Sequence, residues 1–86
     1  MEQLSLFRNW LEQTTEYKNT TKSNIVSRVK RANTILPIIE DPVYLYNLSL
    51  SPEFQKLTVS VKSQLRRAVK IYLKFLKNEG DKYEKQ

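Results

Sequence analysis

Six lysine and arginine side chains recur at helical spacing between residues 60 and 79. At about 100° per residue they project into one arc of roughly 140° on a helix, and they are Lys62, Arg66, Arg67, Lys70, Lys74 and Lys77. No aspartate or glutamate occurs from Phe54 to Asn78, so the i,i+4 ion pairs that usually neutralise such a face are absent. Rows of cations of this kind neutralise the phosphates of a polyanion. The segment predicts a polyanion-binding face, with an ordinary solvated face as the alternative.

A second acid-free segment, residues 17–39, repeats this pattern with fewer charges. Its cations are Lys18, Lys22, Arg28, Lys30 and Arg31. Neutral donors suited to phosphate oxygens gather near the start of its helical part: Thr20, Thr21, Ser23, Asn24 and Ser27. The acidic residues fall instead in residues 2–16, 40–53 and 79–84. This segregation predicts one electropositive side built by the two acid-free segments.

The composition favours the same partner class and removes most enzymes. The 86 residues hold 15 lysines and arginines against 9 acids, a formal charge of +6, and such a balance favours a polyanionic partner. Histidine and cysteine are absent, which excludes the usual zinc, haem and iron–sulfur ligand sets and every imidazole-dependent triad. We therefore expect no metal, no cofactor and no small-molecule substrate.

No other group of residues forms a convincing catalytic centre. The adjacent carboxylates of Glu40 and Asp41 point apart on most backbones, and Asp41 before Pro42 is better explained as a helix cap. Tyr83 has no arginine or histidine constellation beside it that could activate its hydroxyl as a nucleophile. We expect a non-catalytic protein.

The positions of the prolines and the glycine, together with the spacing of the apolar residues, predict helices throughout the chain. Leu4, Phe7 and Leu11 indicate a helix over residues 3–14, and a second helix is expected from Lys22 to about Leu36, capped by Thr20 or Thr21 and ended by Pro37. Asp41-Pro42 and Ser51-Pro52 each predict the start of a short helix, although residues 43–50 also fit an extended piece. The longest helix is expected over residues 60–79, with Gly80 as its left-handed stop.

These elements predict an all-α fold, a small orthogonal bundle of four to five helices. Residues 1–79 would form one domain, and residues 80–86 a disordered tail or the start of a linker. The core positions include the aromatic residues Phe7, Trp10, Tyr72 and Phe75. Tyr17 is the exception, because it lies in a basic loop where its hydroxyl could reach a phosphate.

Two stretches of the sequence resemble a known family. The segment TTKSNIVSRVKRANTIL, followed by SQLRRAVKIYLKFL, is similar to the core-binding domain of tyrosine recombinases, the phage integrases. That domain has a four- to five-helix "SAM-like" fold and forms half of a clamp around duplex DNA. The resemblance covers roughly residues 3–78, rests mostly on core spacing, and implies roles in DNA recombination and DNA integration.

The resemblance also implies which residues face double-stranded DNA. In that family the second and last long helices lie along the major groove and the backbone. When the family's DNA-facing helices are matched to this sequence, the resemblance implies ten DNA-binding residues. They are Lys22, Ser23, Arg28, Lys30 and Arg31 of the second helix and Lys62, Arg66, Arg67, Lys70 and Lys74 of the last. The catalytic arginine, lysine, histidine and tyrosine set of the family has no counterpart in these residues, so cleavage would need a catalytic domain in a longer chain.

Two other functions compete with DNA binding. A protein-interaction or assembly module would dock an acidic partner on the cations, or another domain on exposed Leu45, Leu48 and Leu50. Membrane-surface binding ranks third, because the apolar residues beside the cations are expected in the core. No apolar run is long enough to span a bilayer and no signal peptide is recognisable. We expect a cytoplasmic protein, associated with the nucleoid when it is bound to DNA.

Overall fold

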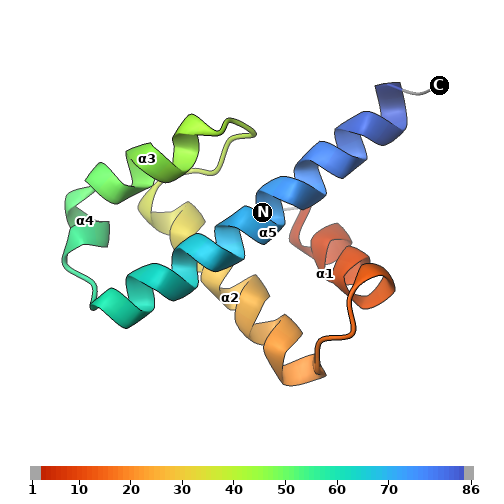
Figure 1. Ribbon diagram of the computed structural model, residues 1–86, viewed down its shortest axis with the longest axis horizontal. Coiled ribbons are helices and arrows are strands. Elements are labelled where there is room, and N and C mark those ends of the chain that lie inside the picture. The colour runs from red at the N-terminus through yellow and green to blue at the C-terminus, as the bar shows by residue number, and fades with distance from the viewer. Residues whose placement is uncertain (1–2, 85–86) are drawn as a thin grey trace.

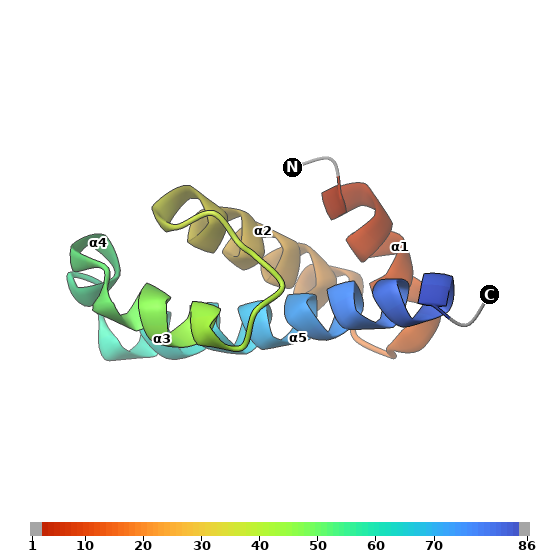
Figure 2. The same ribbon diagram turned by 90° about the horizontal axis from the view of Figure 1, so that it is seen from above.

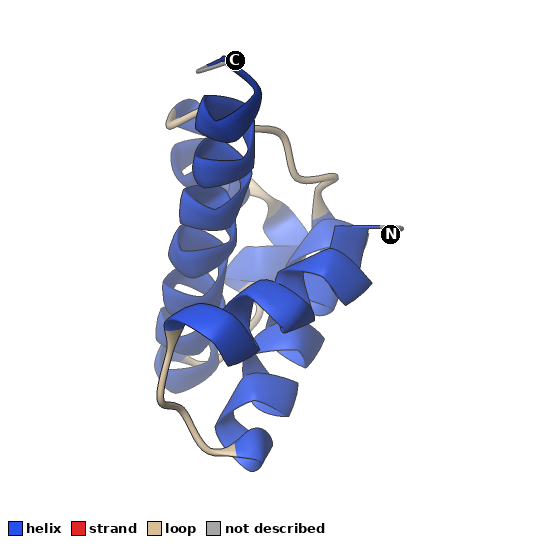
Figure 3. Cartoon of the chain, turned by 90° about the vertical axis from the view of Figure 1, so that its right-hand side faces the viewer, coloured by secondary structure: helices blue, strands red, loops and turns tan. Residues whose placement is uncertain are grey.

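The fold is all-α, as the sequence predicts. The computed structural model describes the backbone of residues 3–84 and the side chains of residues 4–77. Its helices are α1 (Gln3–Thr14), α2 (Asn19–Ile35), α3 (Val43–Leu50), α4 (Pro52–Gln55) and α5 (Val59–Glu84). Loops join them, and the described part of the chain contains no strand (Figure 3).

The long helix α5 organises the bundle. It runs diagonally across the molecule, and α2 crosses behind it (Figure 1). The helix α1 lies toward the C-terminal half of α5, whereas α3 and α4 lie toward its N-terminal half. Seen from above, α2 and α1 lie on one side of α5, and α3 lies beside α5 (Figure 2). The side of α5 that faces away from α2 is therefore an outer surface of the bundle.

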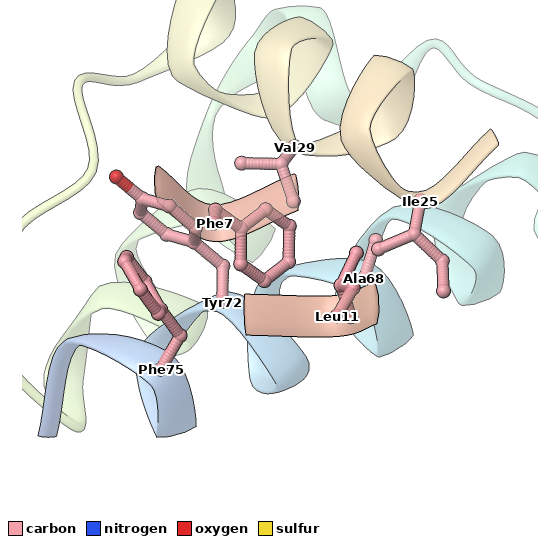
Figure 4. Packing of buried hydrophobic residues seen from close by; sticks show 7 residues of the cluster. All are labelled: Phe7, Leu11, Ile25, Val29, Ala68, Tyr72 and Phe75. Atoms are coloured by element: carbon pink, nitrogen blue, oxygen red, sulfur yellow. The ribbon is translucent and has the colours of Figure 1, made fainter. Parts of the chain in front are cut away.

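Two hydrophobic clusters hold α2 against α5. The first contains Phe7, Leu11, Ile25, Val29, Ala68, Tyr72 and Phe75, contributed by α1, α2 and α5 (Figure 4). Phe7 is fully buried, and its ring meets Tyr72 edge-on with the ring centroids 4.9 Å apart. The second contains Ala32, Tyr44, Leu48, Phe54, Leu65 and Val69, so α3 and α4 close the opposite end of the same α2–α5 contact.

The helix α2 begins earlier than the sequence predicts. It starts at Asn19, after an extended Lys18, and no side chain caps its first turn. The expected cap at Thr20 or Thr21 is therefore wrong, because both threonines lie inside the helix. Its C-terminal end agrees with the prediction, since Leu36 before Pro37 adopts an extended conformation (φ −149°, ψ 117°). The Asn33 Oδ1 atom then accepts a hydrogen bond from the Ile38 N–H at 2.9 Å and fixes the turn.

The two short helices start where the prolines predict. The Asp41 Oδ1 atom accepts a hydrogen bond from the Val43 N–H at 2.9 Å, which caps α3. Residues 43–50 are helical, so the extended alternative is wrong. Pro52 opens α4, although the Ser51 side chain makes no capping hydrogen bond.

The helix α5 is longer at its C-terminal end than the sequence predicts. The Thr58 hydroxyl accepts a hydrogen bond from the Val61 N–H at 3.2 Å and caps its start. At the other end α5 continues to Glu84, and no described glycine has a positive φ. Gly80 is therefore not a left-handed stop. Of the predicted tail, residues 81–84 are the last turn of α5, and residues 85–86 lie outside the described residues.

Candidate nucleic-acid interface

The cations of α5 divide into two groups by exposure. Arg67, Lys70, Lys74 and Lys77 are exposed, whereas Lys62 and Arg66 are half-buried. The guanidinium carbon of Arg66 lies 5.9 Å from the centre of the Phe54 ring, so Arg66 makes a cation–π contact with α4. The exposed group is thus the part of the predicted row that is open to a large partner, and Arg66 has a structural contact of its own.

No carboxylate among the described side chains forms an ion pair with these cations. Among the side chains of residues 4–77, the one ion pair is Arg8–Glu12 within α1, with the Nε and Oε1 atoms 4.0 Å apart. The i,i+4 repulsion between Arg66 and Lys70 and between Lys70 and Lys74 is therefore not relieved by a close carboxylate. A bound polyanion would relieve it.

A groove between the N-terminal half of α2 and the middle of α5 joins the two acid-free segments of the chain. It encloses about 180 Å³, and its lining consists of Tyr17, Thr21, Ile25, Arg28, Gln64, Arg67, Ala68 and Ile71. Arg28 comes from α2 and Arg67 from α5, so arginine residues from two different helices line one small space. No acidic residue is part of this lining.

The predicted residues of α2 do not share one face. Ser23 lies toward α1, because its Oγ atom accepts a hydrogen bond from the Arg8 Nη2 atom at 3.2 Å. Lys30, seven residues after Ser23, lies on the same side of the helix, roughly 160° around from Arg28. Lys22 is half-buried and precedes by one turn Val26, which packs on the cluster that contains Phe7.

Arg31 is the α2 candidate that belongs with Arg28. It is exposed and lies three residues, almost one helical turn, after Arg28. The structure therefore brings Arg28 of α2 and Arg67 of α5 to one groove, with Arg31 almost one turn after Arg28, and it places Ser23 and Lys30 on the other side of α2. We define the basic surface as Arg28, Arg31, Arg67, Lys70 and Lys74.

Two acidic residues border the basic surface, which the sequence reasoning did not anticipate. A second groove, on the α3 side of α5, is lined by Glu40, Asp41, Pro42, Leu45, Lys70, Leu73, Lys74 and Lys77. The turn after α2 therefore brings carboxylates beside the lysines of α5 without forming an ion pair within 4 Å among the described side chains. These carboxylates lower the positive potential along that edge.

Gln64 is the other residue that sequence reasoning missed. It lines the α2–α5 groove one turn before Arg67, and its amide supplies a neutral donor. The signal was available in the spacing, because Gln64, Arg67 and Ile71 recur at i, i+3 and i+7 on one side of α5. Tyr17 and Thr21 line the same groove, and whether the Tyr17 hydroxyl contacts a phosphate stays a prediction.

The surface of α3 carries a separate feature. Val43, Tyr46 and Leu50 follow i, i+3, i+7 spacing, and each exposes half or more of its surface. Of the three leucines expected to be exposed, Leu48 is buried, Leu45 is half-buried and Leu50 is exposed. The prediction of an apolar patch on this segment is right for Leu50 and wrong for Leu48, which packs against α2 and α5.

The described residues contain no other feature that indicates chemistry. No group of acidic side chains in that part of the chain is arranged to hold a metal ion. None of its helices combines the length and the apolar character needed to cross a bilayer. Comparison of the chain with models of protein families, with curated proteins and with solved structures finds no match in any of the three. The resemblance to tyrosine recombinases therefore stays a prediction.

Proposed function

We propose that this chain is a helical module that binds duplex DNA through the basic surface of α2 and α5, mainly by contacts to the phosphate backbone. The observation that carries the proposal is the meeting of Arg28 and Arg67 across one groove whose lining holds no acidic residue. Two acid-free segments, one in α2 and one in α5, thus each place an arginine at the same groove. A phosphate backbone is the common polyanion that such a surface fits.

The outer side of α5 extends this surface. Lys70 and Lys74 are exposed, one helical turn apart, and adjoin the groove edge at Arg67. Phosphate contacts of this kind position a protein on DNA without reading sequence, whereas arginine can bridge the O6 and N7 atoms of guanine. Any base readout in this proposal comes from Arg28 or Arg67.

The resemblance to the recombinase core-binding domain suggests a wider setting. In that setting the module would hold one side of a DNA site, and the cleavage and rejoining chemistry of recombination or integration would come from a separate catalytic domain. This part of the proposal depends on the sequence resemblance alone. The DNA-binding part is also supported by the distribution of charged residues in the structure.

A titration of a fluorescent 20-base-pair duplex with the protein at low salt tests the DNA-binding proposal. We expect saturable binding by the parent protein and a loss of at least tenfold in affinity for the Arg67→Glu/Lys70→Glu double variant. Glu12→Gln, which changes charge on α1 away from the basic surface, is the matched control and should bind as the parent does. An absence of binding up to high micromolar protein would overturn the proposal.

The exposed stripe of α3 favours a second candidate function, a protein-interaction or assembly module. The described helix α3 carries no charged residue. Two copies of a protein with a charge of +6 can therefore meet through α3 without bringing their lysines and arginines close together. Sedimentation velocity over a wide concentration range tests this pairing. A monomer at every concentration would contradict it, and a dimer that Tyr46→Lys abolishes would support it.

A further inference from the structure

The groove between α2 and α5 differs from the rest of the basic surface in being a recess. Its lining combines Arg28 and Arg67 with the apolar side chains of Ile25, Ala68 and Ile71. Apolar walls reduce the screening of charges that face the recess, so an anion held there interacts more strongly than one on an open face. Lys70 and Lys74, in contrast, do not line this recess.

The recess also collects neutral donors from three segments of the chain. The Tyr17 hydroxyl comes from the loop before α2, the Thr21 hydroxyl from the first turn of α2, and the Gln64 amide from α5. Among the described residues, none of these three side chains forms a hydrogen bond with another group of the protein, as no such contact occurs within 3.5 Å. Their donors are free for an external acceptor.

The size and lining of the recess suit a small oxyanion. A space of about 180 Å³ has room for a single phosphate group. Arginine presents its N–H groups in a planar fork that binds two oxygens of one phosphate, which lysine cannot do. Two such forks facing a recess without carboxylates also repel each other when it is empty.

We infer that this recess is a phosphate clamp, in which Arg28 and Arg67 hold one phosphate group and Tyr17, Thr21 and Gln64 supply further hydrogen bonds to its oxygens. The inference rests on the proposed DNA binding for the source of that phosphate, a single position of the DNA backbone. It assigns different roles to cations of equal charge, because Arg28 and Arg67 recognise phosphate geometry and Lys70 and Lys74 contribute charge alone.

Charge-conserving variants distinguish the clamp from general attraction. Arg67→Lys keeps the charge but removes the fork, so we expect duplex affinity to fall about tenfold, the loss of one charge-assisted bidentate contact. The matched change outside the basic surface, Lys30→Arg on the other side of α2, should leave affinity within about twofold of the parent. Circular dichroism verifies that both variants fold. If Arg67→Lys binds as the parent does, the clamp is wrong while DNA binding stands.

A second measurement tests the clamp without DNA. Inorganic phosphate is titrated into the ¹⁵N-labelled protein at constant ionic strength, with chloride as the replaced anion. We expect saturable shifts of the amide resonances of Thr21, Arg28, Gln64 and Arg67 in the parent protein and their loss in Arg67→Lys. Shifts without any duplex binding would support the clamp as a site for free phosphate and overturn DNA as its source. The absence of local shifts would overturn the clamp.

Discussion

The hydroxyl of Tyr44 on α3 donates a hydrogen bond to the carbonyl oxygen of Leu36, at 2.6 Å, where α2 ends. The same hydroxyl lies 3.3 Å from the Ala32 carbonyl oxygen. The side chain is buried and joins the second hydrophobic cluster. One residue thus attaches α3 to the end of α2 through both packing and a hydrogen bond, which fixes the turn at residues 37–42 beside α5.

This tyrosine predicts a loss of stability in alkaline solution. Burial raises the pKa of Tyr44 to about 12, above its usual value of about 10. The native state therefore keeps the proton more tightly than the unfolded chain, so the stabilisation is complete below pH 10 and is lost as the pH rises from about 10 to about 12. Urea denaturation between pH 8 and pH 11.5 measures this decline.

The Tyr44→Phe variant shows how much of the alkaline loss of stability comes from Tyr44 and how much from other side chains. Tyr72 is one of these, because burial also raises its pKa. We expect the variant to lose about 1 kcal/mol of unfolding free energy at pH 8, the net value of a typical hydrogen bond. Between pH 10 and pH 11.5 the difference from the parent should shrink. A constant difference across this range would show that Tyr44 does not account for the decline.

The division of α2 into two faces predicts different effects from neighbouring residues of equal charge. Arg31→Glu should weaken duplex binding about tenfold, because Arg31 lies beside Arg28 on the basic surface. Lys30→Glu makes the same change of two charge units one residue away, on the side of Ser23, and should weaken binding threefold or less. Fluorescence anisotropy with one duplex measures both. Equal losses would contradict the separation of the two faces.

The carboxylates near the α5 lysines predict a variant with higher affinity. Glu40→Gln removes a negative charge from the groove that contains Lys70, Lys74 and Lys77. Duplex affinity should rise about two- to threefold at low salt, and the gain should disappear near 0.2 M salt because exposed charges are screened. Asp41 is left intact, since it caps α3. Unchanged affinity at low salt would show that the Glu40 carboxylate does not weaken the attraction between the basic surface and DNA.

The extended C-terminal part of α5 predicts the effect of replacing Gly80. A left-handed stop at this position would make Gly80→Ala destabilising, because alanine tolerates a positive φ poorly. In a continuing helix the same change should raise the unfolding free energy by up to about 0.5 to 1 kcal/mol, with a smaller gain where the helix end frays. Chemical denaturation of the two proteins decides between them, and a decrease in unfolding free energy would contradict the continuous helix.

The sequence predicts the helices well because their apolar spacing and prolines act locally. Pro37, Asp41 and Pro52 mark real boundaries, and the aromatic positions Phe7, Tyr72 and Phe75 form the core as expected. The predicted start of α2 and the predicted end of α5 are wrong, because threonine and glycine only favour boundaries that tertiary packing can override. Here α2 starts before the threonines and α5 passes through Gly80.

The candidate site is less readable from sequence than the fold. Charge and spacing are enough to predict a row of cations on α5, of which Arg67, Lys70, Lys74 and Lys77 are exposed, but they cannot say which side of α2 is covered. That depends on α1, whose Arg8 contacts Ser23 and separates the α2 cations into two groups. Likewise, the approach of Glu40 to Lys74 depends on the path of the turn after α2, which no local pattern specifies.

The salt dependence of duplex binding tests the central claim most directly. With about five phosphates neutralised by the basic surface, the logarithm of the binding constant should fall against the logarithm of salt concentration with a slope of about −4 to −5. For the Arg28→Glu/Arg67→Glu variant the slope should become shallower by about 2. A binding constant independent of salt, or the same slope in both proteins, would contradict a phosphate-directed surface built by α2 and α5.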